Sequence, residues 1–319
     1  MMTTAPGLVP SNAVPFVNGD VRRAIGRSQR IDIVFAAGGL FALIIAFGLL
    51  FTLLADLATD GLGRIDYDFL TDFPSRRPAG AGMLSAWVGT SLVMLVTAVL
   101  AMPLGVAAGL YLEEYAPKNW VTALIEINVS NLAGVPSIVY GLLALGFFVY
   151  GLGLGQSILV AGMVLALLIL PVVIVATREA VRSIPREMKE GAYALGAEEW
   201  QVMWHYILPF ARPGILTGAI IGLSRAIGEA APLITIGALA FIAFLPPVPF
   251  TGDPPAGLFD WLMSDFTVMP IQMFNWISRP QAGFHINAAA TGVLLMAMTL
   301  AMNAVAILIR FRLRRHSRT

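Results

Sequence analysis

Residues 127–177 read INVSNLAGVPSIVYGLLALGFFVYGLGLGQSILVAGMVLALLILPVVIVAT and contain no charged residue. A membrane helix needs about 20 mostly apolar residues to cross about 30 Å of hydrocarbon, so this stretch is too long for one crossing and suits two. Glycines gather at residues 151–155, and clustered glycines favour a break between helices. The stretch therefore predicts two membrane helices separated at residues 151–156.

The composition of the whole chain is also typical of a membrane protein. Of 319 residues, 58% are hydrophobic and 12% are charged, and the mean hydropathy is +0.80. Soluble domains carry about 25% charged residues. The 31 glycines and 20 prolines are spread through apolar runs, which excludes collagen-like and disordered chains. With no cysteine and three histidines far apart in sequence, we expect no metal site, no catalytic thiol and no redox cofactor.

Apolar runs long enough to cross a membrane occur at about residues 33–54, 84–110, 214–244 and 286–309, besides the two in residues 127–177. We therefore predict an all-α integral membrane protein with six transmembrane helices. We expect the chain to begin with a flexible cytoplasmic N-terminal tail (1–30), a first transmembrane helix (31–55) and an external loop (56–82). A core with five transmembrane helices (83–311) follows, and it includes a cytoplasmic loop (178–212) and an external loop (245–285). The chain is expected to end in a basic cytoplasmic tail (312–319).

The orientation follows from lysine and arginine, which accumulate in short cytoplasmic loops. Placing the N-terminus inside leaves only four basic residues outside, next to several aspartates; these four are Arg64, Arg76, Arg77 and Arg279. We therefore predict a multi-pass protein with both termini in the cytoplasm. The first 20 residues lack a basic segment followed by an apolar one, so we expect a tail and not a cleaved signal peptide.

The external segment 245–285 is rich in proline and then apolar around residues 258–277, with Trp261 and Trp276. Aspartates and a Met-Pro step interrupt it, so we predict an interfacial helix anchored by tryptophan at the lipid headgroups. A seventh membrane span is disfavoured because it would place the C-terminal arginines outside.

The cytoplasmic loop mixes charged with apolar residues and contains EGAYALGAEEWQ at 190–201 and YILP at 206–209. Pro185 and the acidic residues after it predict a helix start, and Gly196 permits a reversal into a second helix. We expect an exposed surface of small residues for close approach of another protein, with aromatic anchors beside it. An amphipathic loop lying on the lipid surface explains these residues equally well. The small residues are Gly191, Ala192, Ala194, Gly196 and Ala197, and the aromatic ones are Tyr193, Trp200 and Trp204.

The spacing in this loop resembles the EAA loop of type I ATP-binding-cassette (ABC) importer permeases, written E-A-A-x3-G-x9-I-x-L-P. Two positions depart from the motif, with Gly191 at the second position and Tyr206 at the isoleucine. The resemblance implies the type I ABC importer permease fold, with cytoplasmic coupling helices. It also implies an ATPase-coupling loop made by Glu190, Gly191, Ala192, Gly196, Leu208 and Pro209.

Other stretches resemble the phosphate-transport branch of that family, in particular its A-type subunit. They are NLAGVPSIVYGL at 131–142, RAIGEAAP at 225–232, and the segment from Asp68 to Arg76 before Gly89 and Thr90. The resemblance implies a permease subunit of an ATP-driven importer of inorganic phosphate in the bacterial cytoplasmic (inner) membrane. The implied partners are a homologous C-type permease subunit, two ATP-binding subunits and an external phosphate-binding protein, with membrane lipid around the complex and no nucleic acid.

The chain itself shows no sign of being an enzyme. It has no G-x-x-x-x-G-K-[ST] motif to cradle nucleotide phosphates, no G-x-S-x-G elbow and no His/Asp/Glu cluster. We expect no catalytic residue and no cofactor here, with ATP and Mg bound by the partner ATPase.

Arg225 and Glu229 are charged residues within the predicted fifth span. They are four residues apart and so share a helix face, and Arg225 is about 18 Å past Pro213, near the middle of the membrane. An ionised group there costs about 2.5 kcal/mol or more, so a function is the default expectation. The pair either holds helices together or places an arginine fork where a tetrahedral oxyanion crosses, and we favour the oxyanion pathway.

Three further expectations remain open at the level of sequence. Glycines at 214, 218 and 222 form a small-residue stripe, for which contact with a second subunit is the favoured use. The same architecture serves other oxyanions such as sulfate or molybdate. A membrane scaffold or sensor of phosphate status is the alternative outside transport, whereas a proton-coupled carrier is disfavoured because Arg225 and Glu229 alone make a poor proton relay.

Overall fold

The computed structural model describes residues 18–251 and 256–316, and over these residues the chain is helical with no β-strand. The predicted all-α class is confirmed. The chain divides into two compact units, residues 1–56 and 57–319. The helices are α1 (Asn18–Gly61), α2 (Tyr67–Thr71), α3 (Leu84–Leu110), α4 (Trp120–Leu132), α5 (Ser137–Ala144), α6 (Ile158–Arg182), α7 (Arg186–Ala194), α8 (Glu199–Val202), α9 (Leu208–Ala226), α10 (Ala231–Thr235), α11 (Met269–Ile277) and α12 (Ala282–His316).

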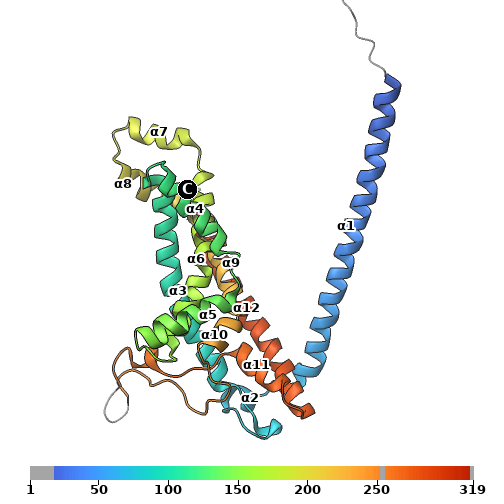
Figure 1. Ribbon diagram of the computed structural model, residues 1–319, viewed down its shortest axis with the longest axis vertical. Coiled ribbons are helices and arrows are strands. Elements are labelled where there is room, and N and C mark those ends of the chain that lie inside the picture. The colour runs from blue at the N-terminus through green and yellow to red at the C-terminus, as the bar shows by residue number, and fades with distance from the viewer. Residues whose placement is uncertain (1–17, 252–255, 317–319) are drawn as a thin grey trace, which may run out of the picture. The chain divides into compact units, whose positions relative to one another are not determined.

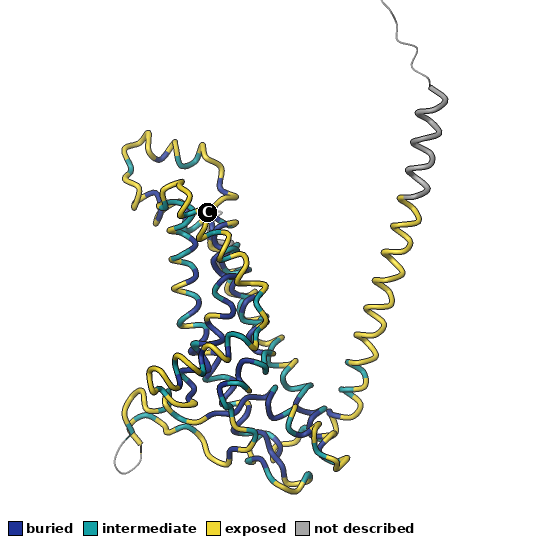
Figure 2. The backbone as a smooth tube through the Cα atoms, in the orientation of Figure 1, coloured by how far each residue is buried: buried dark blue, intermediate teal, exposed yellow. Residues whose placement is uncertain are grey.

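The first unit is formed by most of α1. This helix begins at Asn18, inside the stretch 1–30 that was predicted to be a tail, and residues 1–17 lie outside the described residues. The side chains of residues 33–53 are exposed and mostly apolar (Figure 2). A helix that is hydrophobic all round suits a membrane span.

Helices α3, α6 and α9 run side by side and form the centre of the second unit (Figure 1). Small residues permit this close packing. A Cβ added at Gly109 would lie 2.7 Å from the Thr177 Cβ, and one added at Gly218 would lie 2.3 Å from the Ala176 Cβ. The glycine stripe of α9 therefore packs on α6 of the same chain, and the favoured contact with a second subunit is wrong for these residues.

Five helices in the described residues are long and apolar enough to cross a membrane, and the number becomes six if the bent pair α4 and α5 counts as one span. The pair is bent by 105° at a break over residues 133–136. The predicted third span is thus two helices at a steep angle, a stronger break than the kink expected from a proline within the span. Pro136 explains the break because it lacks a backbone donor and disfavours α-helix at the residue before it. The predicted separation at residues 151–156 is confirmed, since the helical turn after α5 ends at Gly151 and α6 starts at Ile158.

The predicted fifth span differs from the structure at its far end. Helix α9 stops at Ala226, the short α10 follows, and residues 238–251 contain no helix. The chain therefore leaves the helical path near Gly228 and Pro232, and Arg225 lies at the end of a helix and not in the middle of a continuous one.

Part of the segment predicted to lie at the membrane interface belongs to the core, whereas Leu258, Phe259 and Met263 are exposed. Helix α11 packs against α12 and α3, and the Trp276 side chain is fully buried between Phe69 and Phe284. An indole there cannot anchor the chain in lipid headgroups, so that interpretation of Trp276 is wrong. This cluster joins α2 to α11 and α12 through aromatic packing.

Candidate functional site

The loop between α6 and α9 forms a helical hairpin across one end of the bundle (Figure 1). Helix α7 begins after Pro185 and ends at Ala194, and Gly196 then adopts a φ of +83°. Glycine takes that angle without the steric cost that other residues pay. Helix α8 starts with a capping box in which Glu198 and Gln201 satisfy each other's backbone donors. The predicted helix, reversal and second helix are confirmed.

The hairpin is exposed over most of its surface but not at every predicted position. Gly191, Ala194 and Gly196 are exposed, whereas Ala192 is buried at 4% and packs in the hairpin's own core with Val181 and Val202. Ala192 therefore does not belong to an exposed docking surface, because its side chain packs inside the hairpin. Of the other residues carried over from the motif, Glu190 is exposed, and Leu208 and Pro209 are partly buried.

Large apolar side chains project from the same hairpin. Trp200 and Trp204 stand in an edge-on pair with ring centroids 6.1 Å apart, and both remain more than half exposed. Leu195 beside them is 85% exposed. Exposed aromatic residues on a rigid helical turn are typical of protein docking surfaces. Burial raises the pKa of the Tyr193 phenol, and the carboxylates of Glu199 and Glu114 raise it further, so this hydroxyl stays protonated at neutral pH.

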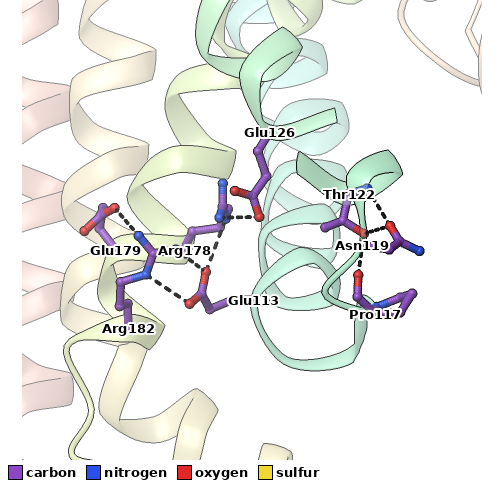
Figure 3. A network of polar contacts seen from close by, with 8 residues as sticks. All are labelled: Glu113, Pro117, Asn119, Thr122, Glu126, Arg178, Glu179 and Arg182. Carbon is purple, nitrogen blue, oxygen red and sulfur yellow. Dashed lines mark hydrogen bonds and ion pairs between the residues drawn. The ribbon is translucent and has the colours of Figure 1, made fainter. Parts of the chain in front are cut away.

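A network of ion pairs lies where the hairpin meets the bundle (Figure 3). Arg178 on α6 is nearly buried, and it donates through Nε to Glu113 at 3.3 Å and pairs through Nη2 with Glu126 at 2.7 Å. Arg182 donates to both carboxylate oxygens of Glu113, at 3.0 and 2.9 Å. Of these pairs, only Arg178–Glu113 is nearly buried at both ends, with side chains 9% and 17% exposed, and removing one partner of such a pair costs about 3–5 kcal/mol.

The network also reaches the hairpin itself. Lys189 of α7 donates to Glu114, which lies beside Glu113 in the π-helical turn at 111–115 after α3. Sequence analysis did not identify Glu113, Glu114 or Glu126 as site residues. The sequence does contain an indication of this network. Glu113 and Glu114 directly follow a long apolar span, and Arg178 and Arg182 are four residues apart at the end of another.

One continuous helical segment, Glu199–Ala226, connects the hairpin with Arg225. At 1.5 Å per residue it spans about 40 Å. Arg225 and Glu229 form the predicted pair, with 3.4 Å between Nε and Oε1, and the Arg225 side chain is 38% exposed. Among the described residues, the two terminal nitrogens of Arg225 make no hydrogen bond or ion pair. Two of the three guanidinium nitrogens are therefore free to donate to an anion.

Two interrupted helices meet beside this pair. Helix α5 packs on α10 so closely that a Cβ on Gly141 would lie 2.6 Å from the carbonyl oxygen of Pro232. Tyr140 of α5 donates its hydroxyl proton across the bend to the carbonyl of Leu132 at 2.8 Å. Non-helical backbone at membrane depth is tolerated only where it is buried in protein or lines a water-filled cavity. The two breaks thus mark the part of the fold that is suited to a polar path.

One of the other polar residues of the spans joins two helices. Thr90 is buried and accepts a hydrogen bond from the backbone of Met269 at 2.9 Å, which fixes the start of α11 against α3. Among the described residues, no group of three or more His, Asp or Glu side chains is placed to hold a metal ion.

Comparison with known proteins agrees with this architecture. Residues 101–318 match the family described as "Binding-protein-dependent transport system inner membrane component". The chain is 34% identical to the probable ABC transporter permease protein YqgI of Bacillus subtilis (strain 168) over 69% of this chain and 76% of that protein. It is 30% identical to the phosphate transport system permease protein PstA of Yersinia pestis over 85% of this chain and 87% of that protein.

A solved structure shares the fold at low sequence identity. A bacterial ABC transporter involved in the import of the acidic polysaccharide alginate matches with a TM-score of 0.59 and 14% identity, over 92% of this chain and 99% of that chain. The chain therefore belongs to the binding-protein-dependent transport system inner membrane components, which are the transmembrane permeases of ABC importers. It is a multi-pass inner membrane protein with the type I ABC importer permease fold.

Proposed function

We propose that this chain is the A-type permease subunit of an ATP-driven importer of inorganic phosphate. The observation that carries the proposal is the state of Arg225: among the described residues its two terminal nitrogens have no partner, and it stands where α5 and α10 interrupt the helical framework. A planar fork with free donors suits a tetrahedral oxyanion. The similarity to PstA over most of both chains supports phosphate as that anion.

In this proposal the hairpin of α7 and α8 is the ATPase-coupling element. A partner ATP-binding subunit contacts the exposed side of the hairpin, at Glu190, Gly191 and Gly196 and the neighbouring tryptophans. ATP and Mg are held by that subunit and not by this chain. Closure of two such subunits moves the hairpin, and the helical segment 199–226 transmits the motion to Arg225 and Glu229. A C-type permease completes the pathway, and an external binding protein delivers phosphate.

The test is ATP-dependent uptake of labelled phosphate and sulfate by proteoliposomes that contain this chain with its partner permease, ATPase and binding protein. We expect phosphate uptake by the wild type. Arg225→Gln removes the charged fork, and we expect uptake to fall at least about tenfold, as for loss of one charged hydrogen bond in the pathway, while the complex still assembles. Sulfate uptake without phosphate uptake by the wild type would overturn the choice of substrate.

Glu229→Gln is the matched variant, because it breaks the same pair and leaves the arginine in place. If Arg225 binds the anion, Glu229→Gln keeps most of the uptake that Arg225→Gln loses. If the pair serves only to hold the helices, the two variants lose uptake alike, and the place of Arg225 on the pathway would be rejected.

A further inference from the structure

The structure assigns to Glu126 and Arg178 a positioning role: we infer that their ion pair is the link through which the coupling hairpin moves the bent pair α4 and α5. This inference rests on the proposed transport function. It concerns residues that touch neither the ATPase-facing side of the hairpin nor Arg225, and whose pairing is visible only in three dimensions.

Helix α4 contacts α6 without burying any of its own residues. None of its residues is buried. A groove of about 440 Å³ separates part of it from α6, lined by residues of both helices such as Ser130 and Val175. Across this groove Arg178 pairs with Glu126 at 2.7 Å, and the Arg178 side chain is only 9% exposed. The Glu126 side chain is 35% exposed, so the pair is partly buried. Removing Glu126 would leave the nearly buried charge of Arg178 without this partner, at a point where α4 has no buried residue of its own.

The other side of Arg178 is connected to the hairpin. Arg178 and Arg182 share Glu113, and the adjacent Glu114 accepts from Lys189 of α7. The ends of α3 and α6, the start of the hairpin and α4 are therefore joined by one chain of ion pairs (Figure 3 shows all of these but the pair of Lys189). A displacement of α7 that keeps the Lys189–Glu114 pair pulls on Glu114 and, through the adjacent Glu113, on Arg178.

The far end of α4 leads to the anion site. After the 105° bend, α5 packs against α10, which directly follows Glu229. Tyr140 bridges the bend by its hydrogen bond to Leu132, so α4 and α5 move as one angled body. Shifting α4 at Glu126 then shifts α5 at Gly141, where it touches Pro232 and Thr235. This gives the hairpin a second route to the site, independent of the continuous segment 199–226.

The absence of cysteine from the sequence makes a direct test simple. Ser130→Cys and Val175→Cys place one spin label on α4 and one on α6. The distance between the two labels is measured in the full complex in lipid nanodiscs, with and without ATP, while ATPase turnover is blocked. We expect the distance distribution to shift when ATP binds. In the Glu126→Gln variant we expect that shift to disappear. We also expect the amount of phosphate taken up per ATP hydrolysed to fall about fivefold or more, which is the size of effect that loss of an allosteric coupling produces. ATP hydrolysis itself should continue.

Glu179→Gln is the matched control. Glu179 belongs to the same cluster but pairs only within α6, with Arg182 at 3.5 Å, and its side chain is 64% exposed. Three results would each overturn the inference. Glu126→Gln could transport as much phosphate per ATP as the wild type, or Glu179→Gln could lose as much transport per ATP as Glu126→Gln does. The third is an ATP-dependent shift in label distance that persists in Glu126→Gln. If Glu126→Gln does not assemble, Arg178→Lys gives the same test, because a lysine keeps the charge but lacks the fork that reaches both Glu113 and Glu126.

A failure of this link is distinguishable from a failure of the proposed function. The label distance reports on α4 whatever anion is carried. A wild-type complex that shows the ATP-dependent shift but imports no phosphate would refute the substrate and leave the link standing.

Discussion

Gly196 is the residue on which the shape of the coupling hairpin depends. Its φ of +83° is costly for any residue with a Cβ, and a Cβ added there would meet nothing within 4 Å. The position thus demands glycine for its backbone angle and not for lack of space. A larger side chain at this position would project from the exposed surface of the hairpin.

We predict that Gly196→Trp uncouples ATP hydrolysis from uptake while the protein still inserts in the membrane. The indole would stand between the hairpin and the ATPase, and the strained angle would add about 1–2 kcal/mol. Gly196→Ala is the control, because it carries the same backbone strain without the bulk. Uptake and ATPase activity measured together in proteoliposomes check this, and normal uptake by Gly196→Trp would show that the ATPase docks elsewhere.

Single residues also show how far a sequence predicts a site. The pair of Arg225 and Glu229 was predicted from its spacing of four and is present at 3.4 Å. The pairs that Arg178 makes were not predicted, because Glu113 and Glu126 lie far from it in sequence and only the fold brings them together. Spacing along one helix is visible in a sequence, whereas contacts between helices depend on how those helices pack.

At the scale of elements, hydrophobic length predicts where helices lie but not where they bend. Helix α3 matches the predicted span 84–110 at both ends. The predicted spans at 127–150 and 214–244 are instead broken at 133–136 and 227–230. An uncharged run gives the same signal whether it crosses straight or turns inside the protein. Pro136 and Pro232 indicate in the sequence where a helix can be kinked or opened, but the size of the bend and the packing of α5 on α10 become visible only in the structure.

The packing of α9 on α6 makes a prediction at this scale. A Cβ on Gly218 would lie 2.3 Å from the Cβ of Ala176, so Gly218→Val must push the two helices apart. We expect a loss of about 1–3 kcal/mol in the free energy of unfolding, typical of overpacking, measured by denaturant titration in detergent micelles. Gly48→Val is the control, since a Cβ on Gly48 meets nothing within 4 Å. Equal stability of the two variants would contradict the packing of α9 on α6.

At the scale of the whole molecule, lysine and arginine gather at one end of the second unit, where glutamates also lie. The hairpin end holds Arg178, Arg182, Arg186 and Lys189 beside an open cavity of about 690 Å³. The opposite end holds the loops around α2 and α11, with aspartates at 66, 68 and 72. Since lysine and arginine concentrate in cytoplasmic loops, the hairpin end should face the cytoplasm, as docking of a cytoplasmic ATPase requires.

This orientation predicts opposite labelling of two exposed serines. Ser183 precedes the hairpin, and Ser278 follows α11 at the other end, so each is replaced by cysteine in the naturally cysteine-free chain. In right-side-out membrane vesicles, a membrane-impermeant maleimide should label Ser278→Cys at once and Ser183→Cys only after permeabilisation. The wild-type chain, which has no thiol, sets the background. Labelling of Ser183→Cys from outside would show that the orientation is the reverse of the predicted one. No cytoplasmic ATPase could then reach the hairpin, so the proposed coupling role of Gly196 and the proposed link through Glu126 would both be refuted.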